Sequence, residues 1–294
     1  MRKLASHSKQ GINRKSLPFK LYEKAKKFGV WNPSDIDFSQ DKEDWKTLTE
    51  AQRNELMQLI AQFYGAEESV THDILPLIAA ISKAGHFEEE MYLTTFLFEE
   101  AKHTDFFSLF LESIGMKDQD LESIPIPAWR RLFHEVLPET MERLYVDQSP
   151  KAIIDACVTY NMFAEGVMAE TGYYYFYECL QSVNKMPGLL EGIRNIKRDE
   201  SRHIAIGTFI IQRLIGEDPS LYDYTLERLN YLNTEIRGQF AQEMVYQAFE
   251  AVNQPKLAEF ANKQFQARLD VLARAKGRSM EEIYNISEEE LGVN

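Results

Sequence analysis

Cysteine is nearly absent from this chain of 294 residues, which has only Cys157 and Cys179. We expect both on one helix, where a rise of about 1.5 Å per residue separates them by roughly 33 Å. This distance excludes a disulfide between them, and free thiols are typical of a reducing cytoplasm. Glycine (14) and proline (10) are scarce, and no run of alternating β-branched residues stands out. The sequence therefore predicts an all-α fold.

Basic residues are also fewer than a nucleic-acid-binding protein would need. Lys and Arg number 33 against 46 Asp and Glu, and the net charge of −13 disfavours nucleic-acid binding, which requires a basic face. The first residues lack the apolar segment of a signal peptide, and no stretch of about 18 apolar residues could span a membrane. We therefore expect a cytoplasmic protein with a single domain over residues 1–294, in which residues 1–46 form a largely irregular N-terminal extension.

Helical patterns fill most of the remaining chain. Within the extension we expect one short helix near residues 19–28. Capping residues and terminal glycines predict longer helices over residues 49–84, 87–114, 128–146, 149–183, 187–216, 218–252 and 256–276. The helices over 49–84 and 87–114 would form one hairpin, and those over 149–183 and 187–216 a second. This pattern indicates a four-helix bundle core with additional helices.

Two Glu-x-x-His pairs are the most informative motifs. In each pair a carboxylate and an imidazole lie three residues apart, on one face of a helix. A lone glutamate precedes the two pairs by 33 and 35 residues, respectively. Four helices that each turn one glutamate inward, two of them adding a histidine, form the ligand set of a di-iron or di-manganese carboxylate bundle. The six candidate metal ligands are Glu67, Glu100, His103, Glu165, Glu200 and His203.

The four glutamates lie in helical stripes that are otherwise apolar. A buried, unpaired carboxylate is costly, and four together would repel one another. Two divalent cations would cancel the four negative charges, and carboxylate with imidazole suits iron or manganese better than soft metals. A single Glu-x-x-His pair arises readily by chance, so coincidence among surface helices is the alternative. The repetition at matched spacing favours a dinuclear metal site.

Residues beside the candidate ligands are less distinctive. Asp199 could accept a hydrogen bond from a ligand imidazole, most readily that of His103, which would orient the ring. An ordinary exposed aspartate is the alternative. Glu68 and Glu99 point off the apolar stripe, so they are either solvated or support a ligand from behind. The remaining histidines have no such context and are expected on the surface or in loops: His7, His72, His86 and His134.

A family resemblance adds to this interpretation. Residues 31–41 and the two Glu-x-x-His motifs resemble ribonucleotide reductase small subunits. Across nearly its full length the chain is more similar to the ligand-binding oxidases related to those subunits, through residues 21–26, 31–41, 67–76 and 93–103. All six candidate ligands match those of the family. The resemblance also implies a hydrogen-bonded chain of Trp31, Asp199 and His103.

The resemblance implies a ferritin-like bundle in which one manganese and one iron ion, or alternatively two irons, react with O2. It further implies a homodimer and a bound long-chain fatty acid whose carboxylate bridges the metals. A count of charges agrees with a bound carboxylate. The negative charges of four glutamates, one hydroxide and one external carboxylate cancel the positive charges of two trivalent ions. The acyl tail would need an apolar channel, although the sequence does not identify its residues.

The same resemblance implies an ether cross-link between Val70 and Tyr160. Val70 lies three residues after Glu67, on the same helix face. Tyr160 lies five residues before Glu165, roughly 140° around an ideal helix. A local π-type irregularity or close helix packing would therefore be needed to turn Tyr160 inward. Removing a hydrogen from an unactivated valine carbon requires redox-active metals.

Two alternatives remain. A radical-generating reductase small subunit would usually end in a mobile tail with an aromatic docking residue, whereas this sequence has no aromatic after Tyr284. A non-catalytic, ferritin-like metal-binding bundle would usually be shorter and would not need the segment around Trp31. We expect an O2-dependent oxidoreductase.

Overall fold

The computed structural model describes residues 4, 7–9, 11–287 and 289–291, and this part of the chain is helical, with no β-strand. The all-α prediction is therefore confirmed. The α-helices are α1 (Leu17–Phe28), α2 (Ser39–Thr47), α3 (Glu50–Asp73), α4 (Leu75–Ala84), α5 (Phe87–Ser113), α6 (Pro127–Arg130), α7 (Leu137–Glu142), α8 (Pro150–Cys157), α9 (Glu170–Val183), α10 (Pro187–Glu217), α11 (Leu221–Tyr231), α12 (Arg237–Glu243), α13 (Gln254–Ala275) and α14 (Met280–Tyr284).

Three π-helical segments continue these helices without a break in the rod. They are η3 (Arg131–Val136), η5 (Val158–Ala169) and η6 (Leu232–Ile236). The segment η5 joins α8 to α9, so that α8, η5 and α9 form one long rod, as predicted for residues 149–183. The segment η6 joins α11 to α12 in the same way.

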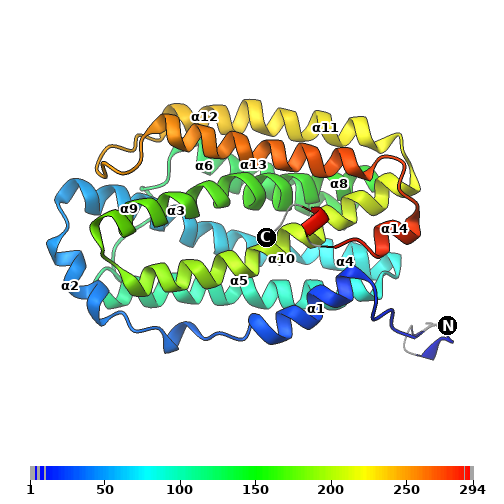
Figure 1. The fold of residues 1–294 in the computed structure, drawn as a ribbon, viewed down its shortest axis with the longest axis horizontal. Helices are drawn as coiled ribbons and strands as arrows, with labels where there is room; N and C mark the ends of the chain where they lie inside the picture. The colour runs from blue at the N-terminus through cyan, green and yellow to red at the C-terminus, as the bar shows by residue number, and fades with distance from the viewer. Residues whose placement is uncertain (1–3, 5–6, 10, 288, 292–294) are drawn as a thin grey trace.

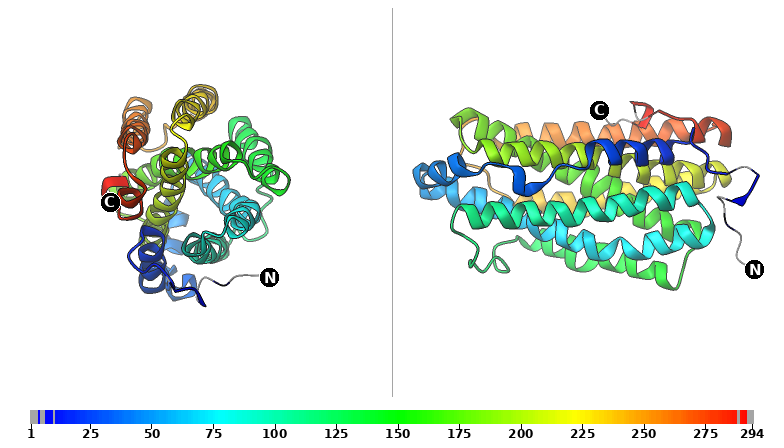
Figure 2. Two further views of the ribbon diagram at one scale, coloured as in Figure 1. Left: turned by 90° about the vertical axis from the view of Figure 1, so that its right-hand side faces the viewer. Right: turned by 90° about the horizontal axis from the view of Figure 1, so that it is seen from below.

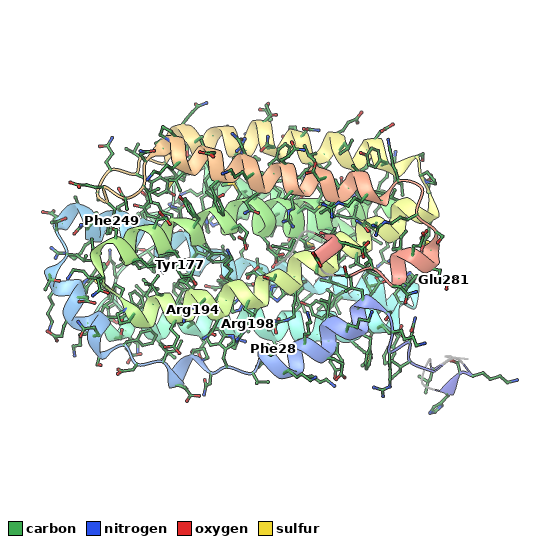
Figure 3. The ribbon with its side chains drawn as sticks, in the orientation of Figure 1. Phe28, Tyr177, Arg194, Arg198, Phe249 and Glu281 are labelled. Atoms are coloured by element: carbon green, nitrogen blue, oxygen red, sulfur yellow. The ribbon has the colours of Figure 1, made fainter. Side chains whose placement is uncertain are left out.

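The core is a bundle of four long rods: α3, α5, the α8–η5–α9 rod and α10 (Figure 1). Helix α3 packs on α5, and α10 packs on η5. Helix α1 lies along α5 and α10, whereas α11 and α13 cover η5 (Figure 2). Arg198 of α10 and Phe28 of α1 lie close together (Figure 3), and the Arg198 side chain donates a hydrogen bond to the Phe28 carbonyl oxygen at 2.8 Å. These additional helices shield the bundle interior, in which the candidate ligands lie.

Local sequence signals explain several helix boundaries. Thr49 and Gln52 form a capping box at the start of α3, and the Ser149 side chain caps α8. Gly85 ends α4 in the left-handed conformation, with φ of 87°. The predicted helix over residues 49–84 is interrupted at Ile74, because Pro76 has no N–H to donate to the carbonyl oxygen four residues before it.

The N-terminal extension is more helical than predicted, since residues 39–47 form α2. Two carboxylates of α2, those of Asp41 and Asp44, are buried. Asp41 accepts hydrogen bonds from the backbone N–H groups of Gly188 and Leu189, and Asp44 accepts one from Met186. Helix α2 therefore supplies carboxylates to the N-terminus of α10, where unpaired N–H groups and the helix dipole favour negative charge.

The predicted helix over residues 218–252 is too long. It ends at Glu243, and the chain then runs without helix to Asn253. Glu55 of α3 accepts hydrogen bonds from the backbone N–H groups of Gln247 and Ala248, which a helix would require for itself. This tertiary contact replaces helical hydrogen bonding and is invisible to a local sequence pattern.

Other predictions about exposure are confirmed. Both cysteines are free and buried. His7, His72 and His134 are exposed and His86 is half-buried, all outside the bundle interior. Among the described residues, no helix is both long and apolar enough to cross a lipid bilayer.

Close packing of α10 on α5 yields a first testable prediction. A Cβ atom at Gly192 would lie 1.9 Å from Cε2 of Phe106, which is fully buried and cannot move aside. We expect Gly192→Ala to lower the free energy of unfolding by about 1–3 kcal/mol, measured by urea denaturation. Gly238→Ala is the control, because nothing lies within 4 Å of a Cβ there. Equal stability of the two variants would contradict the prediction.

Candidate metal centre

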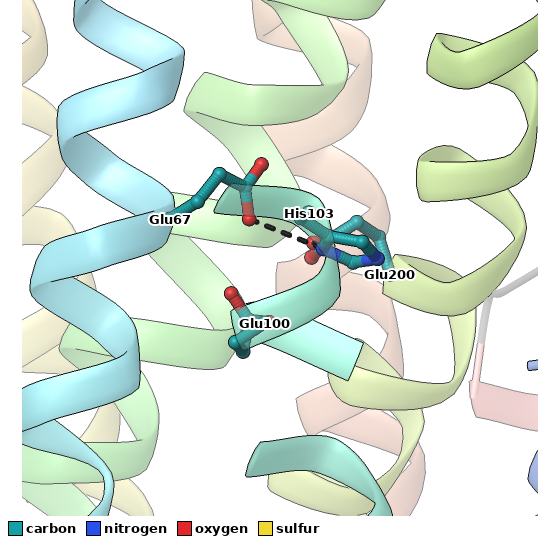
Figure 4. Close-up of side chains that lie close together, drawn as sticks. All are labelled: Glu67, Glu100, His103 and Glu200. Carbon is teal, nitrogen blue, oxygen red and sulfur yellow. Dashed lines mark hydrogen bonds and ion pairs between the residues drawn. The ribbon is translucent and has the colours of Figure 1, made fainter. Parts of the chain in front are cut away.

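Each rod of the bundle turns one glutamate into the interior: Glu67 from α3, Glu100 from α5, Glu165 from η5 and Glu200 from α10. His103 follows Glu100 by one helical turn, and His203 follows Glu200 in the same way. All six predicted residues are buried, with both histidines fully inaccessible to solvent. Figure 4 shows four of these side chains converging: Glu67, Glu100, His103 and Glu200.

The donor atoms form two overlapping groups. One comprises Glu67, Glu100, His103 and Glu200, and the other comprises Glu100, Glu165, Glu200 and His203. Within each group, one donor atom per residue lies within 4.8 Å of all the others. Glu100 and Glu200 belong to both groups. Two neighbouring positions that share two carboxylates are the arrangement expected for a dinuclear centre.

The two imidazoles are oriented in the same way. Nδ1 of His103 faces Glu67 Oε2 at 3.1 Å, and Nδ1 of His203 faces Glu100 Oε1 at 2.8 Å. Nε2 of each ring faces away from the four candidate ligand glutamates, toward another carboxylate of the opposite helix. Nε2 of His103 lies 3.3 Å from Asp199, and Nε2 of His203 lies 2.8 Å from Glu99. A proton on Nε2 would then be donated outward, leaving the Nδ1 lone pair for a cation.

Several polar atoms at the centre have no hydrogen-bond partner although they are fully buried. They are Glu100 Oε1, Glu165 Oε1, Glu200 Oε2 and His203 Nδ1, and the 2.8 Å approach of His203 Nδ1 to Glu100 Oε1 lacks the geometry of a hydrogen bond. Buried polar atoms are almost always satisfied in native proteins, so a cluster of exceptions requires an explanation. Carboxylate oxygens and an imidazole nitrogen with free lone pairs are the donor set that iron and manganese take, so the residues fit a pair of these ions.

Electrostatics supports this fit. Burial, together with repulsion from Glu200 and Glu67, raises the pKa of Glu100 well above its usual value. Burial and repulsion from Glu200 likewise raise the pKa of Glu165. Burial opposes ionisation of Glu200 too, but contacts with His203 and His103 lower its pKa to about 2. The protein alone therefore does not stabilise all four negative charges, and cations would.

Asp199 organises the polar network behind His103. Its Oδ2 accepts hydrogen bonds from Trp31 Nε1 at 2.7 Å and from Lys102 Nζ at 2.8 Å, and its Oδ1 accepts one from Arg202 at 2.7 Å. Burial disfavours the ionised form, but the contacts with His103, Lys102 and Arg202 outweigh this and hold the pKa of Asp199 far below its usual range. Trp31, Asp199 and His103 thus lie in the hydrogen-bonded order that the resemblance implies.

Glu99 is the counterpart of Asp199. It is 1% exposed, accepts from Arg202 at 2.5 Å, and lies 2.8 Å from Nε2 of His203. The sequence left open whether it is solvated, and the structure shows that it is not, whereas Glu68 is exposed. A signal was present, since Glu99 precedes Glu100 as Asp199 precedes Glu200. The two halves of the centre repeat the same three-part pattern of outer carboxylate, ligand glutamate and histidine.

Tyr160 lies in a π-helix, which is one of the two ways of turning it inward that the sequence left open. The segment η5 is π-helical from Val158 to Ala169, so the five residues from Tyr160 to Glu165 approximate a whole turn. Tyr160 is 0% exposed and its hydroxyl has no hydrogen-bond partner. Burial and the surrounding glutamates raise its pKa well above the usual value, so the phenol remains protonated.

A cavity of about 330 Å³ opens beside the centre. Glu67, Glu100, Glu165 and Glu200 line it, together with both Val70 and Tyr160. From there it extends past α3 and α9 to α12 and α13. Its walls are mostly apolar, and their residues include Phe63, Ala66, Met168, Phe240 and Leu257. The sequence could not identify these residues, because they come from helices that are distant in the chain.

Comparison with known proteins agrees with this geometry. The sequence model of the family "Ribonucleotide reductase, small chain" matches residues 19–272. Three solved structures of R2-like ligand-binding oxidase illustrate the structural similarity. A tyrosine-to-phenylalanine variant with an anaerobically reconstituted Mn/Fe cofactor is 38% identical over 90% of this chain and 97% of its own, with a TM-score of 0.83.

A valine-to-leucine variant, also with an anaerobically reconstituted Mn/Fe cofactor, is 36% identical over 95% of this chain and 100% of its own, with a TM-score of 0.85. A glycine-to-leucine variant with a non-activated Mn/Mn cofactor is 38% identical over 90% of this chain and 96% of its own, with a TM-score of 0.83. The chain therefore belongs to the ribonucleotide reductase small chain family, is similar over most of its length to the R2-like ligand-binding oxidases, and is an oxidoreductase with a ferritin-like fold.

Proposed function

We propose that the protein activates O2 at one manganese and one iron ion, with two irons as the alternative pair. Glu67, Glu100, His103, Glu165, Glu200 and His203 would hold the ions, with Glu100 and Glu200 shared between the two positions. The observation that carries this proposal is the overlap of two four-residue donor groups in a fully buried site. Asp199 and Glu99 would fix the rings of His103 and His203 from behind.

The cavity supports binding of a long-chain fatty acid. Its inner end carries the donor carboxylates, and its walls are lined with methyl, methylene and aromatic groups. A carboxylate at the inner end would bridge the cations and add one negative charge, as the charge count of an oxidised centre requires. The acyl chain would lie between Ala66, Met168 and Phe240, where burial of each methylene stabilises binding by about 0.8 kcal/mol.

An ether cross-link between Val70 and Tyr160 is the proposed oxidation product. Both side chains line the cavity beside the glutamates. Forming the link breaks the Tyr160 O–H bond and one C–H bond of Val70, and it makes one C–O bond. Two protons and two electrons leave the protein, and O2 is the acceptor. The bound metal pair would supply O2 activation and electron transfer. The unpartnered hydroxyl of Tyr160 has no hydrogen bond to lose when it reacts.

Intact mass spectrometry tests this function directly. Protein loaded with manganese and iron in air should be lighter by two hydrogen atoms than the same protein loaded without O2, and tryptic peptides containing Val70 and Tyr160 should elute as one species. Metal analysis and anomalous scattering on the same sample should find two ions between the six side chains. An unchanged mass with separate peptides would contradict the cross-link, and a lack of bound metal would contradict the oxidase proposal as a whole.

The family match and the order Trp31–Asp199–His103 also favour a second candidate, a radical-generating reductase small subunit. This alternative predicts that the metal-loaded protein stimulates a ribonucleotide reductase large subunit. The oxidase proposal predicts no stimulation. By resemblance we also propose a cytoplasmic homodimer, which light scattering of the purified protein would test.

A further inference from the structure

The outer part of the cavity contains an arginine that lacks an acidic partner. Arg237 begins α12 and lines the same cavity as the four glutamates. Its side chain is half-buried, and within the described part of the chain no carboxylate forms an ion pair with it. Burial alone lowers the pKa of Arg237, without an opposing contribution from a neighbouring acid. Because the side chain is partly withdrawn from water and has no acidic partner, a ligand carboxylate in the cavity would complete its environment.

Two strongly buried arginines of α10 show how this fold compensates the charge of a guanidinium group. Arg202 pairs with Glu99 and Asp199, and Arg213 pairs with Glu89 at 2.8 Å. In both cases the fold supplies a carboxylate to the guanidinium group that it buries. The lack of such a partner at Arg237 coincides with its position on the cavity wall.

A buried polar atom without a hydrogen-bond partner lies one turn before Arg237. Asn233 of η6 also lines the cavity, and its side-chain Oδ1 is buried without a hydrogen-bond partner. An amide offers both donor and acceptor atoms, and its two ends can exchange by rotation. Arg237 and Asn233 are four residues apart and thus lie on one helix face. Together they form a polar position in an otherwise apolar wall.

This position is separate from the metal centre. The centre lies within the four rods of the bundle, whereas α12 lies outside them and packs on α6 (Figure 1). A simple fatty acid has one polar end, which the proposed function assigns to the metals. Its methyl end would then meet a guanidinium and an amide, which an apolar group cannot satisfy.

Resting on the proposed function, we infer that the ligand is polar at both ends: a long-chain acid with a second carboxylate, which Arg237 and Asn233 bind while the first carboxylate faces the metal centre. The planar guanidinium can donate two parallel hydrogen bonds to a carboxylate. Arg237 is thus a specificity-determining residue that selects the distal end of the ligand.

Competitive binding to the metal-loaded protein tests the inference. The probes are hexadecanoate and hexadecanedioate, which differ only in the distal carboxylate, with shorter and longer diacids in parallel to match the cavity length. Calorimetric titration should give about tenfold tighter binding of the best-fitting diacid than of the monoacid of equal length. Arg237→Ala should abolish this preference without changing monoacid affinity, and Arg237→Lys should retain part of it.

Arg131→Ala is the matched control. Arg131 donates a hydrogen bond to Gln239 of α12 at 2.9 Å but does not line the cavity, so its loss should leave the diacid preference intact. Equal affinity for monoacids and diacids at every length would overturn the inference and leave the proposed function standing. Equal weakening of both ligands by Arg237→Ala would also overturn it, because Arg237 would then hold the sole carboxylate. Failure of both acids to bind would overturn the proposed function as well.

Discussion

Replacing Glu100 with glutamine is expected to have opposite effects on the metal-free and metal-loaded proteins. In the metal-free protein the carboxylate is buried, lies among other glutamates, and has one oxygen without a hydrogen-bond partner. Glutamine keeps the shape and removes the charge. We therefore expect Glu100→Gln to raise the free energy of unfolding of the metal-free protein by about 1–3 kcal/mol at pH 8.

The pH dependence of this effect follows from the direction of the pKa shift. The folded-state pKa of Glu100 is raised above its usual value of 4.5 by burial and by repulsion from Glu200. The folded protein thus holds this proton more tightly than the unfolded chain. The resulting stabilisation is fully present below pH 4.5 and is lost as the pH rises through the folded-state pKa. Since glutamine does not titrate, the advantage of the variant should be small at pH 4.5 and grow toward pH 8.

With manganese and iron present the sign should reverse. Glu100 belongs to both donor groups, so its loss weakens both metal positions. Each tenfold loss of affinity removes about 1.4 kcal/mol of metal-dependent stability. Denaturation with and without metal, together with metal analysis, measures both effects. Glu68→Gln is the control, because that side chain is 63% exposed, and it should change neither quantity. Parallel behaviour of the Glu100 and Glu68 variants would contradict a metal role for Glu100.

The contrast between Glu99 and Glu100 shows what a local sequence pattern can and cannot predict about burial. The apolar stripe of each helix predicted that six side chains face the bundle interior. This prediction was possible because the helix period depends only on spacing within one helix. Glu99 lies off that stripe, and a single helix does not reveal that Arg202 and His203 of α10 cover it. The sequence could have suggested it only through the repeat with Asp199. The burial of Glu99 therefore depends on contacts between helices, which the pattern of a single helix cannot predict.

Helix α2 and the cavity are two further features that depend on contacts between distant segments of the chain. The segment over residues 39–47 is polar, and its helix is stabilised by contacts of Asp41 and Asp44 with α10 and not by an apolar face of its own. The cavity is lined by residues from α3 to α13, so no segment alone could reveal it. Tyr160 is the opposite case. Five residues cannot bring two side chains to one face of an α-helix, so an inward Tyr160 required either a π-type irregularity or close helix packing, and the structure contains the π-helix.

Tyr160→Phe is expected to abolish the oxidative loss of mass without removing the metals. Phenylalanine fills the same space but lacks the oxygen that would bond to Val70. Tyr160 is not among the clustered metal-donor residues, so metal content should remain that of the parent protein. The variant should also be as stable as the parent or slightly more so, because it removes a buried hydroxyl that has no hydrogen-bond partner.

Tyr173→Phe is the matched control for this experiment. Tyr173 is 1% exposed and lines the same cavity, and burial together with Glu200 raises its pKa well above the usual value, as for Tyr160. Both variants would be loaded with manganese and iron in air and their masses compared with oxygen-free samples. The Tyr173 variant should lose two hydrogen atoms and the Tyr160 variant none. Loss of two hydrogens by both would show that the oxidation lies elsewhere in the protein, whereas retention by both would point to a general loss of O2 chemistry.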